Sequence, residues 1–313
     1  MSKEKKPKGR PPKNLNLNLA ELKPEQNINI ENLFPITKIM TKRTALIDEK
    51  SLYKYKFKDV GTIITLTECL KQQKSPYTII FTNNGIIITY SESDKSEATV
   101  ECKIFPDNAI EYTSKTGLDV IINIEMDKLC NALKTIPKKN ICSINLLEDN
   151  GGKTLEISDS SSEGGPVTLK RIPITIPITY TNINYLEKSN YECIIMMEAK
   201  VFCETCKSIA SSEHKDFEMQ YKNKKFDFSW GNTDCRKTFT PDKKFIIIKD
   251  TDRKICNKYT ITCFKKFLVP ITKISTTVKI YLSLEAPTIM EYNSDGIAVT
   301  QIMCKIKNEI KSK

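Results

Sequence analysis

Hydrophobic and polar residues alternate along much of the chain from Leu52 onward, a pattern that is typical of half-buried β-strands. Tyr53, Tyr55 and Phe57 give the first example. The alternation predicts strands at 53–57, 77–82, 86–90, 98–105, 109–113, 118–124, 141–147, 153–158, 166–172, 191–197, 217–221, 225–230, 245–249, 278–284, 288–292 and 297–306.

Four other stretches place apolar residues at helical spacing, and each of them follows a predicted strand. Three of them predict helices at 60–73, 126–136 and 199–211. The fourth follows a short strand near Tyr259, and its apolar stripe consists of Phe264, Phe267, Leu268 and Ile271. Prolines at 76 and 137 end the first two helices, because proline disfavours a helical conformation in the residue before it.

The order of strand, helix and antiparallel strands occurs twice before residue 172 and twice after residue 190. Asn83-Asn84-Gly85 and Asn150-Gly151-Gly152 are strong signals for hairpin turns within the first half. The apolar, proline-punctuated stretch between the halves lacks a helical period and suits an extended connector. We therefore predict a disordered basic tail over 1–40, an α+β domain over 41–172, a connector over 173–189 and a second α+β domain over 190–313.

The composition limits the function. The chain has 313 residues and a formal net charge of +11, which favours a polyanionic partner such as nucleic acid. Its 11 cysteines, without a signal peptide, predict reduced thiols and an intracellular location. No apolar run has the length of a membrane span, so we expect no membrane partner.

The usual signs of an enzyme are missing from the sequence. The single histidine, His214, leaves little room for acid–base or metal chemistry, and no phosphate-binding glycine loop or hydrolase motif occurs. Cys203 and Cys206 form a C-x-x-C sequence on a predicted helix, without a second ligand pair or a thioredoxin-like context. We interpret them as small core residues and predict no catalytic residue, no metal and no cofactor.

The basic N-terminal tail contains a short DNA-binding-like motif. The segment 5–13 resembles an AT-hook, in which a Gly-Arg-Pro core lies in a narrow minor groove; Lys8 and Arg10 are the residues that would contact DNA. Lys8 stands where an AT-hook has arginine. The alternative is a plain basic tail or a localisation signal.

The stretch from Tyr259 to Tyr292 combines a strand, a basic amphipathic helix, a Ser/Thr-rich turn, a strand, a proline break and a further strand. This stretch, and the order of elements over residues 50–307, resembles the DNA sliding clamps of the proliferating-cell-nuclear-antigen (PCNA) type. The basic tail resembles that of clamp homologues from large DNA viruses. The resemblance implies an α+β DNA-clamp fold of two topologically similar domains, each with two helices on antiparallel sheets, which forms a ring.

In this family the helices face a central channel and carry basic residues toward duplex DNA. Carried over by position, the resemblance implies DNA contacts at Lys71, Lys134 and Lys207. On the fourth helix the family's position holds Pro270, and Lys273 is the nearest basic residue, with Lys265 on the same helix. Further candidate contacts are the lysines that flank helix ends, Lys58, Lys74, Lys138 and Lys139. The alternative is that these lysines only form a solvated surface.

The resemblance also implies two protein-binding surfaces. Partner peptides of the family dock beneath the connector, which here gives a groove of Ile178, Tyr180, Ile183, Tyr185, Leu186, Pro287, Ile302 and Met303. Ring closure requires strand addition between subunits. The candidate residues are Val167, Leu169 and Arg171 in the first domain, with either 237–240 or a strand containing Phe245 and Ile247 in the second.

The resemblance thus implies a non-enzymatic processivity factor that encircles duplex DNA as a homotrimer and tethers DNA polymerase and other replication and repair proteins. The competing interpretation is a monomeric accessory factor that binds DNA with one basic face. Its oligomeric state discriminates between the two.

Overall fold

The structure is a computed structural model that describes residues 51–57, 59–71, 76–91, 98–137, 140–149, 151–160, 169–176, 187–231, 234–262, 274–294 and 296–303. These residues all belong to one compact unit, Thr44–Lys313. The basic tail, most of the predicted connector and the predicted helix around Phe264–Ile271 lie outside the described residues.

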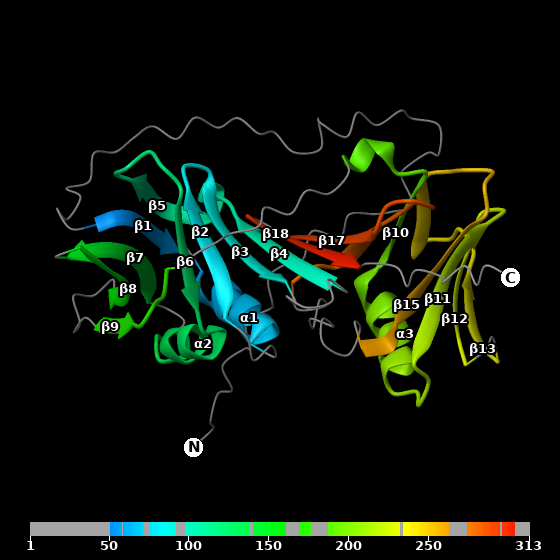
Figure 1. Cartoon of the computed structure of the whole chain (residues 1–313), viewed down its shortest axis with the longest axis horizontal. Coiled ribbons are helices and arrows are strands. Elements are labelled where there is room, and N and C mark those ends of the chain that lie inside the picture. Colours follow the sequence, from blue (N-terminus) through cyan, green and yellow to red (C-terminus); the bar gives the residue numbers. More distant parts are fainter. Residues whose placement is uncertain are drawn as a thin grey trace, which may run out of the picture. The chain divides into compact units, whose positions relative to one another are not determined.

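Figure 1 shows the strands, most of which lie where the sequence pattern predicted them; β13 (Cys235–Phe239) was predicted only as a candidate edge at 237–240. Side chains of β1 alternate between buried and partly exposed. In β1 the rings of Tyr53, Tyr55 and Phe57 are each 1% exposed. The first half of the chain contains β1 (Ser51–Phe57), β2 (Tyr77–Thr82), β3 (Gly85–Ser91), β4 (Ala98–Ile104), β5 (Ala109–Ser114), β6 (Val120–Ile124), β7 (Ile141–Asp149), β8 (Gly152–Ser160) and β9 (Leu169–Ile172). The second half contains β10 (Cys193–Glu198), β11 (Asp216–Lys222), β12 (Lys225–Trp230), β13 (Cys235–Phe239), β14 (Phe245–Lys249), β15 (Ile255–Thr260), β16 (Thr277–Leu282), β17 (Thr288–Ser294) and β18 (Ile297–Met303).

The strands form three sheets, and every pairing between the described strands is antiparallel. A five-stranded sheet has the order β5-β1-β7-β8-β9, and a four-stranded sheet has the order β13-β12-β11-β15. The third sheet has nine strands in the order β14-β10-β16-β17-β18-β4-β3-β2-β6. It joins the halves of the chain through β18 and β4, which pair from Ile297↔Ile104 to Met303↔Ala98.

The two halves repeat one topology. The order β14-β10-β16-β17-β18 within the large sheet matches the five-stranded sheet β5-β1-β7-β8-β9, strand for strand. Likewise β4-β3-β2-β6 matches the four-stranded sheet β13-β12-β11-β15. The hairpins also align, since Thr82 pairs with Gly85 across the turn between β2 and β3 just as Lys222 pairs with Lys225 between β11 and β12. The pairing of β18 with β4 therefore joins the last strand of the second repeat to an edge strand of the first repeat.

Within the described residues, three α-helices pack on these sheets: α1 (Val60–Leu70), α2 (Met126–Lys134) and α3 (Ala199–Ala210). The N-cap of α1 is Asp59, whose carboxylate accepts a hydrogen bond from the Gly61 amide at 2.8 Å. Each helix buries one apolar face, represented by Leu66, Leu133 and Phe202. Helices α1 and α2 lie next to each other, and α3 packs on β10 and β16.

The observed helices are shorter at their C-termini than the sequence pattern predicted. In α2, Lys134 is the last helical residue and Thr135 is the C-cap, although the apolar pattern continues to Ile136. The side chain of Thr135 donates a hydrogen bond to the carbonyl oxygen of Ala132, which satisfies a backbone acceptor in the last turn. Two short 3₁₀ turns, Pro106–Asn108 (η3) and Lys188–Asn190 (η4), complete the described elements.

Candidate nucleic-acid interface

Among the described helices, α3 carries the most available positive charge, on its exposed face. Lys200 and Lys207 are both exposed and stand seven residues apart, so they lie on the same side of the helix. Within the described residues neither lysine forms an ion pair. Glu204 lies between them and reduces the local charge. The sequence prediction included Lys207 and missed Lys200, although its two-turn spacing from Lys207 was a usable signal.

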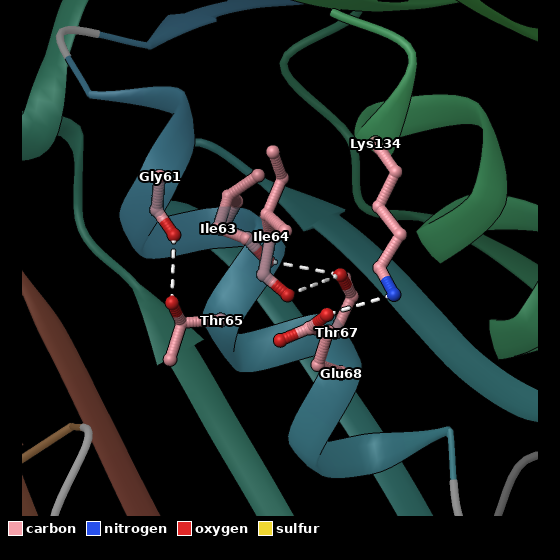
Figure 2. Close-up of polar contacts among 7 residues, drawn as sticks. All are labelled: Gly61, Ile63, Ile64, Thr65, Thr67, Glu68 and Lys134. Carbon is pink, nitrogen blue, oxygen red and sulfur yellow. Dashed lines mark hydrogen bonds and ion pairs between the residues drawn. The ribbon is translucent and has the colours of Figure 1, made fainter. Parts of the chain in front are cut away.

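The lysine of α2 is in a different situation. Lys134 Nζ lies 2.7 Å from a carboxylate oxygen of Glu68 on α1, an ion pair that bridges the two helices (Figure 2). The hydrogen bond to Glu68 raises the pKa of Lys134. Lys128 is paired in the same way with Glu125, at 2.8 Å. An anion that approaches α2 therefore meets lysines whose charge is already compensated by carboxylates.

Helix α1 offers few groups to a polyanion. Figure 2 shows the hydroxyl of Thr65 directed at the carbonyl oxygen of Gly61, at 2.8 Å. It shows the Thr67 hydroxyl between the carbonyl oxygens of Ile63 and Ile64, each at 3.0 Å. These hydroxyls are used within the helix. The predicted contact Lys71 is the C-cap residue, and it is the one cation in the described stretch 59–71.

The other predicted DNA contacts lie outside the described residues: Lys8, Arg10, Lys58, Lys74, Lys138, Lys139, Lys265 and Lys273. Of the predicted residues that are described, Lys71 and Lys134 lie on the adjacent helices α1 and α2, and Lys207 lies on α3. Each remains a predicted contact.

A small apolar cluster lies apart from the main core. Its members are Tyr191, Ile194, Tyr281, Ala286, Ile289 and Ile302. Of the predicted peptide-groove residues, Ile302 belongs to this cluster, and the carbonyl of Pro287 accepts a hydrogen bond from the Tyr191 hydroxyl at 2.8 Å. Leu284 nearby is 42% exposed.

Met303 requires a correction. Neighbouring residues of a strand point to opposite faces, and Met303 is 0% exposed within the main core, on the other side of β18 from Ile302. It therefore does not line the same surface as Ile302. The other predicted groove residues, Ile178, Tyr180, Ile183, Tyr185 and Leu186, lie outside the described residues.

The chain is fastened to the sheet on both sides of this undescribed part of the connector. On one side, Thr175 and Asn123 exchange two backbone hydrogen bonds, of 2.7 and 3.0 Å. On the other side, Lys188 is ion-paired with Glu291 of β17 at 2.5 Å, and the Tyr281 hydroxyl donates to the same carboxylate at 2.8 Å. Burial favours the neutral form of Glu291, but Lys188 and Tyr281 together keep its pKa below the ordinary value.

The sheet edges differ in how much they expose. Leu169 of β9 is 53% exposed, and Arg171 is paired with Glu156 of β8 at 3.4 Å. Val167 lies outside the described residues. On β13, Arg236 is paired with the buried Asp227 of β12. Phe245 of β14 is 2% exposed and packs against Phe226 and Phe239.

The C-x-x-C sequence has no sign of a redox or metal site. Cys203 and Cys206 are 5% and 0% exposed, and both belong to the main core. Burial raises the pKa of the Cys206 thiol, so the reactive thiolate is disfavoured. Within the described part of the chain, no group of three or more His, Cys, Asp or Glu side chains is arranged to hold a metal ion. No described helix is long and apolar enough to cross a membrane.

The chain thus consists of two topological repeats of antiparallel sheet, joined edge to edge through β18 and β4 and packed with helices. Among solved structures, the chain is similar to the crystal structure of Proliferating Cellular Nuclear Antigen from Entamoeba histolytica, with a TM-score of 0.68. The sequences are 14% identical, and the match covers 82% of this chain and 99% of that chain. No family profile and no curated protein matches the sequence. The comparison therefore confirms a PCNA-like fold for this chain; a fold alone does not establish an activity.

Proposed function

We propose that this protein is a non-enzymatic sliding clamp, which encircles duplex DNA and serves as a processivity factor for DNA polymerase. The observation that carries the proposal is the joint between β18 and β4, because it connects two copies of one topology within the chain. The same joint made between chains would close a ring of repeated units. The exposed lysines of α3 support a sequence-independent contact with DNA phosphates.

The internal repeat indicates which edges would join. Strand β9 corresponds to β18, and β13 corresponds to β4, yet β9 and β13 are both terminal strands of their sheets. Pairing β9 of one copy with β13 of the next satisfies both edges by strand addition. The repeat favours β13 over β14, since β14 corresponds to β5, which also ends its sheet. On this proposal Phe245 and Ile247 are not interface residues.

The repeat also gives a register for this joint. Aligning the paired strands of the two halves equates Lys170 with Gln301, because their partners Ile157 and Met290 occupy equivalent positions. It equates Cys235 with Val100 through the equivalent partners Trp230 and Tyr90. Gln301 pairs with Val100 within the chain. The expected pairing between chains is therefore Lys170 with Cys235.

One observation favours the second candidate, a monomeric accessory factor that binds DNA on one basic face. The two edges that would join are both basic, with Lys170 and Arg171 on β9 and Arg236 and Lys237 on β13. Like charges across a strand pair oppose association. The ion pairs of Arg171 with Glu156 and of Arg236 with Asp227 reduce this repulsion without removing it.

For protein partners, we propose that short peptides of replication and repair proteins bind over the apolar cluster around Ile302 and Pro287. The protein would act wherever DNA is replicated inside the cell. The basic tail, through its similarity to viral clamp homologues, supports a viral replication site as that place.

The experiment is to measure the molar mass by light scattering and the retention of the protein on DNA. A closed ring predicts a trimer that remains on nicked circular DNA at high salt and slides off after the circle is linearised. Topological retention does not depend on ion pairs, whereas a one-face contact weakens steeply with salt on both DNA forms. A monomer with equal retention on circular and linear DNA would overturn the clamp proposal in favour of the monomeric factor.

A further inference from the structure

The hairpin between β11 and β12 concentrates positive charge. Its residues Lys222, Asn223, Lys224 and Lys225 are all exposed and are called the basic turn below. Lys222 and Lys225 are cross-strand partners, so two like charges stand opposite each other, which opposes hairpin formation. Within the described residues, neither of them forms an ion pair, and Lys224 has a single contact of this kind, 3.9 Å from Asp250.

The backbone of the basic turn is unfavourable for its sequence as well. Asn223 has φ = 51° and Lys224 has φ = 59°, both in the left-handed region. A two-residue turn of this geometry favours Asn followed by Gly, because a side chain such as that of lysine is rarely found at positive φ. Lys224 is thus unfavourable in two ways, because it adds positive charge beside two other lysines and because its backbone has a positive φ. Such a conflict between sequence and local structure is typical of functional positions.

The fold itself does not require this charge, as the first half of the chain demonstrates. The equivalent hairpin between β2 and β3 has Asn83 and Asn84 in the turn and Gly85 after it, and none of them is charged. There the positive φ, 124°, falls on Gly85. The same topology is therefore built without lysines and without a strained side chain.

Further cations adjoin the basic turn. Ile255, the first residue of β15, pairs with Tyr221, so Arg253 and Lys254 lie beside Lys222, and both are exposed. The acidic residues of that loop are Asp250, which accepts a hydrogen bond from the Tyr221 hydroxyl, and Asp252. No large exposed hydrophobic side chain occurs at 222–225 or 250–254. Such a surface suits recognition of phosphates and not stacking on bases.

We propose that the basic turn, together with Arg253 and Lys254, is a second nucleic-acid contact that binds the phosphodiester backbone. This contact is distinct from Lys200 and Lys207 of α3, and it does not require that the protein form a ring. It extends the proposed function by giving the protein a place to hold a strand in addition to the duplex bound by the helices.

The test compares the triple variant Lys222→Gln, Lys224→Gly, Lys225→Gln with the wild-type chain, using a fluorescent single strand of about 12 nucleotides, near the site size of single-strand binders. We expect the slope of log affinity against log salt to fall by about 2, from the loss of three phosphate contacts on a single strand. We also expect an unchanged or higher melting temperature, because Lys224→Gly relieves the strained turn and the other two changes remove repulsion. A purely structural role for these lysines predicts no change in binding.

Two control variants show whether a change in binding is specific to the basic turn. Lys56→Gln, Lys103→Gln, Lys153→Gln removes the same charge from other strands and should retain the wild-type slope. Lys200→Gln with Lys207→Gln tests the helix contact alone. If the turn variant binds the oligonucleotide as the wild-type chain does, this proposal is overturned. If that variant has at the same time lost binding to polyglutamate, the basic turn binds an acidic protein partner instead. The clamp proposal is judged separately, by oligomeric state and by retention on circular DNA.

Discussion

Single side chains decide where charge is available on this protein. Lys188, Tyr281 and Glu291 form a connected group in which a mostly buried carboxylate receives both an ammonium group and a hydroxyl. The tyrosine ring also lies beneath the Lys188 ammonium, 5.8 Å from its centroid. This group attaches the chain before β10 to the sheet, close to the apolar cluster that we propose as the peptide site.

A pH dependence follows from this group. The folded pKa of Glu291 is below its ordinary value, so its stabilising contribution is present above the unfolded pKa of about 4.3 and is lost as the pH falls through the lower, folded value. We expect Glu291→Gln to lower the denaturation midpoint at pH 7 and to reduce the loss of stability as the pH falls below about 4.3. Chemical denaturation at several pH values measures this. Glu285→Gln, at an exposed carboxylate, is the control, and a wild-type profile in Glu291→Gln would contradict the assignment.

The lysines of different helices should also differ in their contribution to DNA binding. Lys207→Gln removes an exposed charge that has no ion pair among the described residues, so the salt slope for duplex binding should fall by about 0.9. Lys134→Gln should change the slope less, because Glu68 already compensates its charge. Glu68→Gln should raise the affinity by freeing Lys134. Fluorescence anisotropy over a salt series checks all three, and equal slopes for the two lysine variants would argue against a role of the ion pair.

At the level of secondary structure, most elements could be predicted from the sequence because they depend on local patterns. The alternation of Tyr53, Tyr55 and Phe57 is sufficient to indicate β1, and Asn83-Asn84-Gly85 marks the first hairpin. What could not be predicted is non-local. The pairing of β18 with β4 and the ion pair between Lys134 and Glu68 both depend on segments far apart in the chain.

Strand edges provide a test at this scale. A proline at Leu169 or Lys170 in β9, at the position whose amide points away from β8, removes a free N–H from this edge and should shift a trimer toward monomer. Consecutive amides of a strand alternate in direction, so in β13 the amide of either Lys237 or Thr238 points away from β12. A proline at that position should act in the same way. Ile248→Pro in β14 is the matched control on the edge that we do not place in the interface. Light scattering at micromolar concentration measures the shift, and dissociation by the β14 variant alone would assign the joint to β14.

In the whole molecule, two strands lack the pairing that their counterparts in the other repeat have. These are β9 and β13, which end their sheets, whereas their counterparts β18 and β4 pair with each other. The proposed ring closure would turn these two edges into the same joint that β18 and β4 form within the chain. Processivity would then be topological, so weak and mobile phosphate contacts on the helices would be sufficient to guide DNA. A linear assembly or a monomer with the same edges exposed would have no such property.

The register between Lys170 and Cys235 allows the ring to be locked covalently. Both residues follow the core-facing alternation of their strands, so Lys170→Cys should place its sulfur opposite the native Cys235 of the next copy. Directly opposed strand residues have Cβ atoms about 4.5–5.5 Å apart, which small adjustments bring within reach of a disulfide. We expect mild oxidation to give a denaturant-resistant trimer that stays on nicked circular DNA even in detergent. Lys170→Cys with Cys235→Ser should not cross-link, and Arg171→Cys, on the opposite face of β9, should cross-link poorly. If Arg171→Cys cross-links and Lys170→Cys does not, the register differs from the expected one by one residue. If neither variant cross-links although the protein is a trimer, the subunits are not joined through β9 and β13.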